Sequence, residues 1–249
     1  MTTGEPSETP EMPEPAAPTE PTAPTEPTDL AEPAAPTEPT ESAELPAVIV
    51  YGDADAPHTL DIYEDMRCSY CAVLEHELGA TIKALADDGT YRIAYHVANF
   101  LDRGNERGGS TNSLSALGAA AEQGVDQFAA LRVSLFDYRR THGSEGLADL
   151  DIIRGIVAQT PGVDFLAVSK AINEDRFRAW ALETGPASLV SLRAAWAAAE
   201  LPGRAGTPAA FLDGRAVEVF TEQDDVVSAE EFEANVKAAV TAVTSAELA

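Results

Sequence analysis

Apolar and polar positions follow a period of two in several short runs along the chain, and these runs predict strands. Residues 47–51 (AVIVY) are an apolar run closed by Gly52, which is the pattern of a buried strand. Residues 58–63 and 91–97 alternate apolar with polar side chains, which is typical of strands. Between them, residues 71–86 place apolar side chains at helical spacing. This strand–helix–strand order predicts a parallel crossover.

A long stretch of helical spacing then interrupts the strands. From about residue 110 to 201, apolar side chains recur every three or four positions, which predicts consecutive helices, the last at about residues 187–199. Two short strands are expected at residues 209–212 and 216–220, because the Asp-Gly pair between them is a strong hairpin signal. A final helix is expected at residues 229–244. The order of elements therefore predicts an α/β fold with a helical insertion.

Composition separates a tail from the rest of the chain. Residues 1–46 contain 12 of the 17 prolines and 11 acidic residues, with no Lys, Arg or aromatic residue. Such a segment has too little apolar surface to offset the entropy cost of folding, and its spaced prolines favour extended conformations. We therefore expect a disordered Pro/Thr/Glu/Ala-rich tail at residues 1–46, followed by one folded domain at residues 47–249.

The charge stays strongly acidic without this tail. The whole chain has 42 Asp plus Glu against 16 Lys plus Arg, and residues 47–249 keep 31 acidic side chains against all 16 basic ones. Nucleic acids and anionic membranes bind clustered positive charge, so neither is an expected partner.

Neither a leader nor a membrane span is recognisable in the sequence. No stretch before residue 47 has the basic start and the apolar run of roughly 7–15 residues that a secretory signal needs. No later stretch approaches the roughly 20 apolar residues that cross a bilayer. The expected location is therefore the cytoplasm, and the alternative is the cell envelope if the natural start lies upstream of Met1.

The two cysteines of the chain carry the chemistry. Cys68 and Cys71 form a C-x-x-C motif where a predicted strand gives way to a predicted helix. At a helix start, unpaired backbone N–H groups and the helix dipole both favour a thiolate at Cys68. Arg67 adds a positive charge directly before it. Cys71, one turn inside the helix, is placed to resolve a mixed disulfide formed at Cys68.

Three other interpretations of the cysteine pair are weaker. A zinc site completed by His76 and His96 is disfavoured, because the chain has no second C-x-x-C and these histidines fall on a helix and a strand. A purely structural disulfide closes too short a loop to stabilise much. Two inert buried thiols rarely fall together at a strand–helix junction. We therefore expect redox chemistry with no metal and no cofactor.

Several other polar residues have ordinary explanations. Glu64 and Asp65 come directly before the motif, and we expect a solvated strand end there rather than proton carriers. Residues 104–109 (GNERGG) lack the features of a phosphate-binding loop and are expected to lead flexibly into the helical insertion. Ser110 and Ser113 have no base nearby in the sequence and are expected to be helix caps.

The motifs together resemble the DsbA family of thioredoxin-fold disulfide oxidoreductases. The resemblance rests on residues 68–71 (CSYC), on residues 206–208 (GTP) before the predicted hairpin, and on the helical insertion between them. It covers residues 47 to 245 and implies a thioredoxin-like fold. It further implies that Pro208 is cis and packs beside the cysteines, and that Thr207 offers its backbone to an extended substrate chain.

The resemblance also assigns roles to the residues of the motif. Cys68 becomes the attacking cysteine and Cys71 the resolving one, and Ser69 and Tyr70 form the dipeptide that tunes the redox potential. Arg67 is expected to contribute to this tuning through its charge and position rather than through the resemblance. Strongly oxidising members of the family carry Pro-His at this dipeptide, so the Ser-Tyr pair leaves the direction of electron flow open.

The sequence thus predicts a thiol–disulfide oxidoreductase that exchanges a Cys68–Cys71 disulfide with polypeptide thiols through a mixed disulfide at Cys68. Its partners are expected to be thiol-containing or disulfide-containing polypeptides and a further redox protein that resets the disulfide, and the chain is expected to be monomeric. Two alternatives remain open. One is a binding module that keeps the fold without catalysis, and the other is an isomerase or transferase that depends on a small thiol.

Overall fold

The computed structural model describes Met1 and residues 45–247, with side chains described up to residue 243. The predicted tail at residues 1–46 therefore lies almost wholly outside the described residues, and the division into tail and domain stays a prediction. No helix in the described part of the chain is long and apolar enough to cross a membrane.

Within residues 45–247 the strands form one five-stranded sheet with the order β1-β3-β2-β4-β5. Its strands are β1 (Ile49–Tyr51), β2 (Thr59–Asp65), β3 (Arg92–Ala98), β4 (Ala209–Leu212) and β5 (Arg215–Val217). β2 and β3 pair in parallel, and the other neighbours pair antiparallel. The predicted parallel crossover and hairpin are confirmed, although β5 ends three residues before the predicted end.

Helices occupy the connections from β2 to β3 and from β3 to β4, and a last helix follows β5. They are α1 (Ser69–Asp87), α2 (Gly109–Ala121), α3 (Val125–His142), α4 (Leu150–Gln159), α5 (Phe165–Asn173), α6 (Arg178–Ala198) and α7 (Ala229–Glu247), with short 3-10 turns η1 (Phe100–Asp102) and η2 (Glu145–Ala148). Helices α2 to α6 lie between β3 and β4, which confirms the helical insertion.

Helix α6 begins nine residues before the predicted start, and Pro186 lies inside it. The sequence does not predict the first part of this helix, because Gly185 and Pro186 both weaken helices. Packing explains why the helix continues: a Cβ atom at Gly185 would lie 2.3 Å from the side-chain carbon of Asn99. The glycine thus allows α6 to approach the segment that follows β3.

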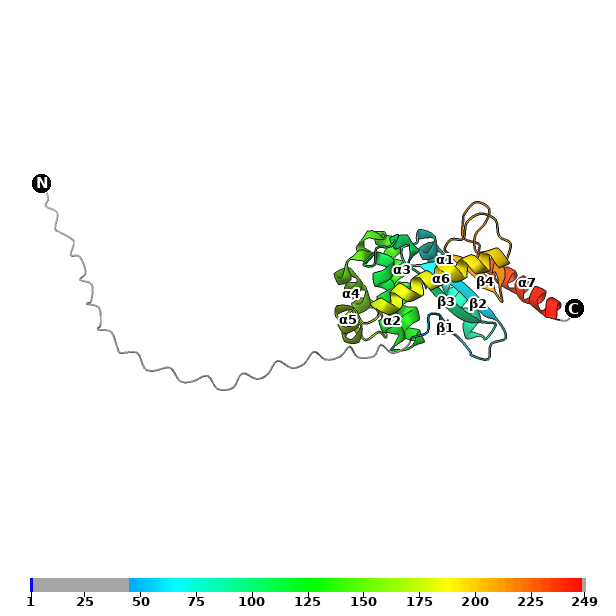
Figure 1. The fold of residues 1–249 in the computed structure, drawn as a ribbon, viewed down its shortest axis with the longest axis horizontal. Coiled ribbons are helices and arrows are strands. Elements are labelled where there is room, and N and C mark those ends of the chain that lie inside the picture. Colours follow the sequence, from blue (N-terminus) through cyan, green and yellow to red (C-terminus); the bar gives the residue numbers. More distant parts are fainter. Residues whose placement is uncertain (2–44, 248–249) are drawn as a thin grey trace. The chain divides into compact units, whose positions relative to one another are not determined.

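The sheet lies between two helical layers. Tyr63 and Phe211 project from one face and pack against Leu192 of α6, which crosses the sheet in Figure 1. Leu60 and Ile62 project from the other face and belong to the main core, together with apolar side chains of α1 and α7. The alternation along β2 therefore decides which residues meet which layer.

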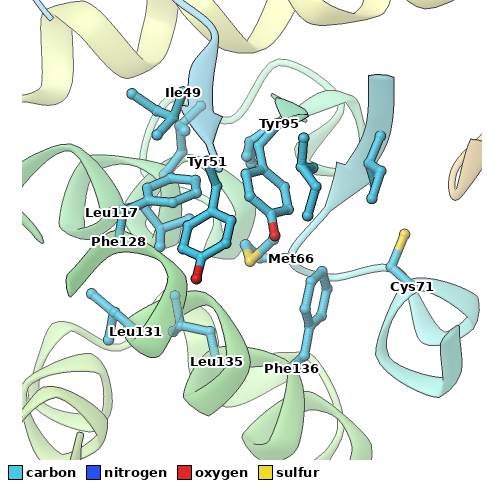
Figure 2. Packing of buried hydrophobic residues seen from close by; sticks show 14 of the residues in the cluster. Ile49, Tyr51, Met66, Cys71, Tyr95, Leu117, Phe128, Leu131, Leu135 and Phe136 are labelled. Atoms are coloured by element: carbon cyan, nitrogen blue, oxygen red, sulfur yellow. The ribbon is translucent and has the colours of Figure 1, made fainter. Parts of the chain in front are cut away.

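The main core extends from the sheet to the helical insertion and ends at the C-x-x-C motif. Figure 2 shows side chains of α2 and α3 packed against the tyrosines of β1 and β3, with Met66 beside them. Cys71 lies at the margin of this cluster. The residues before the motif are therefore held from both sides, by the sheet and by the insertion.

Candidate active site

Cys68 lies where the chain passes from β2 into α1. It is the N-cap residue of α1, with φ −68° and ψ 125°. Its backbone N–H donates to the carbonyl oxygen of Asp65 at 2.8 Å, and its own carbonyl accepts from the N–H of Ala72 at 3.3 Å. The side chain therefore lies at the positive end of the helix dipole, beside N–H groups without partners in the helix.

The environment of Cys68 favours its thiolate. Both cysteines are free thiols, and Cys68 is 8% exposed. A hydrogen bond from the Cys71 thiol lowers the pKa of Cys68 to about 6, although burial acts in the opposite direction. Hydrogen bonds from the backbone of Cys71 and Tyr70 lower this pKa further. Cys68 is therefore largely ionised at neutral pH, which is the nucleophilic form of a thiol.

Cys71 has the opposite character. It is 2% exposed and forms part of the main core. Burial raises the pKa of the Cys71 thiol well above its usual range, and the neighbouring Cys68 sulfur raises it further. One sulfur is therefore acidic and the other is a neutral, enclosed hydrogen-bond donor. This arrangement suits attack at Cys68 followed by resolution through Cys71.

The register of the sheet brings a distant segment to the cysteines. β4 pairs antiparallel with β2, with Ala209 opposite Tyr63, so the residues before β4 lie beside the end of β2. The Thr207–Pro208 peptide bond there is cis. The Cys68 sulfur lies 3.3 Å from the carbonyl oxygen of Thr207, to which its protonated form donates a hydrogen bond. The backbone of residue 207 is thus next to the reactive sulfur.

The guanidinium of Arg67 binds the segment that follows β3. One of its guanidinium nitrogens donates to the carbonyl oxygen of Leu101 at 2.9 Å and to the carboxylate of Asp102 at 3.2 Å. Its charge is therefore paired with that of Asp102, which is buried. Arg67 connects the residue before Cys68 to η1.

The dipeptide between the cysteines faces outward. Ser69 is exposed, and Tyr70 is 50% exposed. The Tyr70 ring makes an edge contact with the ring of Phe220, with 5.7 Å between the ring centres. Phe220 belongs to the segment between β5 and α7. An aromatic pair from two separate parts of the chain therefore borders the motif on its exposed side.

The burial of Asp65 differs most from the expectation based on the sequence. The residue was expected at a solvated strand end, but it is fully buried, because the helical insertion covers the end of β2. Its carboxylate accepts hydrogen bonds from the Ser110 hydroxyl at 2.5 Å and from the N–H groups of Arg67 at 3.0 Å and Leu101 at 3.1 Å. Burial raises the pKa of Asp65 to about 6, and these hydrogen bonds oppose the rise.

Glu64 is buried too, on the opposite face of β2. Both nitrogens of one edge of the Arg132 guanidinium donate to its carboxylate, at 2.7 and 2.6 Å, and the third nitrogen donates to Glu75 at 2.5 Å. The guanidinium lies over the rings of Tyr95 and Phe136. This ionic cluster ties β2 to α1 and α3. One feature of the sequence indicates this cluster, because Arg132 falls among the apolar positions of a predicted helix.

The histidines proposed in the zinc interpretation lie elsewhere. His96 makes a 2.7 Å contact with Asp61 on β2 and stacks on Tyr63, with 4.3 Å between ring centres. His76 is exposed, 3.9 Å from Glu77. In the part of the chain that the structure describes, no group of three or more His, Cys, Asp or Glu side chains is arranged to hold a metal ion.

Comparison with known proteins supports the fold. The family model described as thioredoxin matches residues 44–238. No curated protein matches the chain. Among solved structures, MdbA of Corynebacterium matruchotii, a thiol-disulfide oxidoreductase, is 23% identical with a TM-score of 0.59, covering 69% of this chain and 83% of that one.

Two further structures are similar over more of this chain. DsbA of Chlamydia trachomatis is 19% identical with a TM-score of 0.58, covering 82% of this chain and 96% of that one. BdbD of Bacillus subtilis is 15% identical with a TM-score of 0.59, covering 78% and 94%. The predicted likeness to DsbA-type proteins is thus confirmed for the fold. The chain belongs to the thioredoxin family, and its fold is similar to that of these solved structures.

Proposed function

We propose that this protein is a thiol–disulfide oxidoreductase that acts on polypeptides through Cys68 and Cys71. The observation that carries the proposal is the unequal pair of thiols, because Cys68 has its pKa lowered to about 6 while that of Cys71 is raised. Membership of the thioredoxin family and the fold shared with a named thiol-disulfide oxidoreductase support it.

The reaction is a pair of thiolate–disulfide exchanges. In the oxidised enzyme, a substrate thiolate attacks the sulfur of Cys68, forms a mixed disulfide, and releases Cys71 as a thiolate that takes up a proton. A second thiolate of the same substrate then attacks the substrate sulfur of the mixed disulfide and releases Cys68 as a thiolate. The substrate leaves with one disulfide, and the enzyme gains the two electrons. Reduction of a substrate disulfide follows the same steps in reverse.

The surroundings of Cys68 favour an extended polypeptide as substrate. The carbonyl of Thr207 lies beside the sulfur of Cys68. Contacts with backbone groups do not depend on the side chains of the substrate, so they suit polypeptides of many sequences. Exposed Tyr70, in edge contact with the partly buried Phe220, offers apolar contact next to these backbone groups.

Oxidation of clients is the direction that the site favours. Groups that stabilise the Cys68 thiolate stabilise the reduced enzyme and so make its disulfide a stronger oxidant. Disulfides form and persist in oxidising compartments, so we place the protein in the cell envelope rather than in the cytoplasm. A further redox protein then has to remove the electrons. Fractionation of cells that express the full-length natural gene tests the location.

Activity assays with single variants test the function. Cys68→Ser is expected to abolish both oxidation of a reduced, unfolded protein and reduction of insulin. Cys71→Ser is expected to accumulate a mixed disulfide with the client, visible as a reducible band on a non-reducing gel. Full activity of Cys68→Ser contradicts the proposal.

The same assays separate the two alternatives. A binding module retains client binding in both serine variants and shows no turnover in the native protein. A transferase that depends on a small thiol adds that thiol to an electrophile without any disulfide turnover. Either pattern replaces the oxidoreductase proposal.

A further inference from the structure

The turn that carries Cys68 is held by a buried carboxylate, that of Asp65, and by Arg139 of α3, which donates to the carbonyl oxygen of Arg67 at 2.6 Å. The side chain of Asp65 accepts from the N–H of Arg67, two residues later, and the backbone carbonyl of Asp65 accepts from the N–H of Cys68. A backbone hydrogen bond from Asp65 also reaches the Cys71 sulfur. Asp65 therefore fixes the backbone of Cys68 and of the residue before it.

The other partners of this carboxylate come from outside the sheet and α1. Ser110 donates its hydroxyl to Asp65 from the first turn of α2, and Leu101 donates its N–H from η1. Both segments follow β3 and lead into the helical insertion. The insertion is thus connected to the active-site turn by hydrogen bonds to Asp65 as well as by apolar packing.

A second carboxylate holds the insertion at the same place. Asp102 accepts from the N–H groups of Ser110 at 3.0 Å and Thr111 at 2.7 Å, the first turn of α2, and it also binds Arg67. Ser110 is therefore fixed by its backbone to Asp102 while its hydroxyl binds Asp65. This leaves its hydroxyl little freedom to adopt another orientation.

We propose that Asp65 is a positioning residue for the disulfide exchange: with Ser110 of the insertion, it holds the 65–68 turn so that the Cys68 sulfur faces the N–H groups at the start of α1. The hydrogen bonds described for the Asp65 carboxylate join it to the turn and to the insertion. It acts through the backbone of the turn. The role rests on the proposed function, because it concerns the cysteine that the function uses.

In Asp65→Asn, loss of the positioning role and loss of a negative charge shift the Cys68 pKa in opposite directions. Removing a nearby negative charge by itself stabilises a thiolate and lowers the Cys68 pKa. Asp65→Asn keeps the size of the side chain but places an amide NH₂ group among hydrogen-bond donors, which loosens the turn. Loss of the N–H groups from the sulfur raises the Cys68 pKa instead.

The experiment measures the Cys68 pKa in the reduced full-length protein, by ultraviolet absorbance of the thiolate against pH. Asp65→Asn is expected to raise it by about one unit, a roughly tenfold lower ratio of thiolate to thiol at fixed pH. The reduction potential at pH 8 should become more negative by about 30 mV, which is the same tenfold change for two electrons. Ser110→Ala, which keeps the carboxylate, is expected to give a smaller rise in the same direction.

Asp61→Asn is the matched control, since it removes the same charge from the same strand at a residue that contacts His96 and not the turn. It is expected to leave the Cys68 pKa unchanged. A lower or unchanged pKa in Asp65→Asn overturns the proposal. If Asp65→Asn fails to fold, Ser110→Ala decides, because an unchanged pKa in that variant overturns the proposal as well.

The proposed function and the positioning role of Asp65 can be tested separately. If native protein has no disulfide turnover, the function is wrong even where Asp65→Asn moves the pKa as expected. If native protein is active and Asp65→Asn leaves the pKa and the potential unchanged, only the positioning role is wrong.

Discussion

The thiol of Cys71 donates a hydrogen bond to the sulfur of Cys68, and this contact contributes most to the lowered pKa of Cys68. In the proposed reaction Cys71 thereby has two roles. In the reduced protein it stabilises the Cys68 thiolate, and in the mixed disulfide it is the group that resolves the complex.

The dual role of Cys71 leads to a prediction about substitutions at this position. Cys71→Ala removes the donor, so the pKa of Cys68 should rise from about 6 toward its ordinary value of about 8.5. Cys71→Ser retains a donor and should keep the pKa closer to that of the native protein. The rate of alkylation by iodoacetamide across the pH range measures both. Equal pKa values in the two variants contradict the role of this hydrogen bond.

The unequal pKa values also predict how the reduction potential depends on pH. Above pH 6, reduction of the disulfide yields a Cys68 thiolate and a Cys71 thiol, so it consumes one proton; below pH 6 it consumes two. The potential should therefore become more negative by about 30 mV per pH unit above pH 6 and by about 60 mV below it. Equilibration with a glutathione buffer at several pH values checks the slope, and a single slope of about 60 mV across neutral pH rules out an acidic Cys68.

The ionic cluster under the sheet predicts a large loss of stability from one substitution. Arg132→Met leaves the carboxylates of Glu64 and Glu75 without their cation, and breaking a buried pair in this way costs about 3–5 kcal/mol. Urea denaturation of the oxidised protein measures the change in the free energy of unfolding.

A triple variant provides the control for this prediction. Adding Glu64→Gln and Glu75→Gln to Arg132→Met removes the unpaired charges, so most of the lost stability should return. If Arg132→Met alone costs less than about 1 kcal/mol, the cluster does not hold β2 to the helices in the way described.

Two glycines of the insertion provide a matched pair. A Cβ atom at Gly108 would lie 2.2 Å from the carboxylate carbon of Asp102, whereas nothing lies within 4 Å of one at Gly155. Gly108→Ala should displace Asp102 from the N–H groups of α2 and cost about 1–3 kcal/mol. Gly155→Ala, inside α4, should stabilise by about 0.5–1 kcal/mol. Thermal unfolding of both variants checks the difference, and equal effects contradict it.

The sequence was sufficient to predict the elements whose patterns are local. The period-two runs, the helical stretch and the C-x-x-C motif at a strand–helix junction all depend on neighbouring residues. The resemblance to DsbA-type proteins added the cis proline before β4, which no local pattern indicates.

The parts that could not be predicted depend on contacts between distant residues. In the sequence, Glu64 and Asp65 have the features of a solvated strand end. Their partners Arg132 and Ser110 lie 68 and 45 residues further along the chain, so no local pattern indicates that the two carboxylates are buried. The orientation of Arg67 depends on Leu101 and Asp102 in the same way, since both are brought to it only by the parallel pairing of β2 with β3.

The two edges of the sheet are its shortest strands. β1 and β5 each have three residues, while the seven-residue strands β2 and β3 lie inside. A long open edge is a template on which another extended chain aggregates. A protein that acts on polypeptide thiols, as we propose, meets extended chains at every turnover. Edge strands of three residues offer such a chain little backbone to pair with, which disfavours a substrate that stays bound as an added strand.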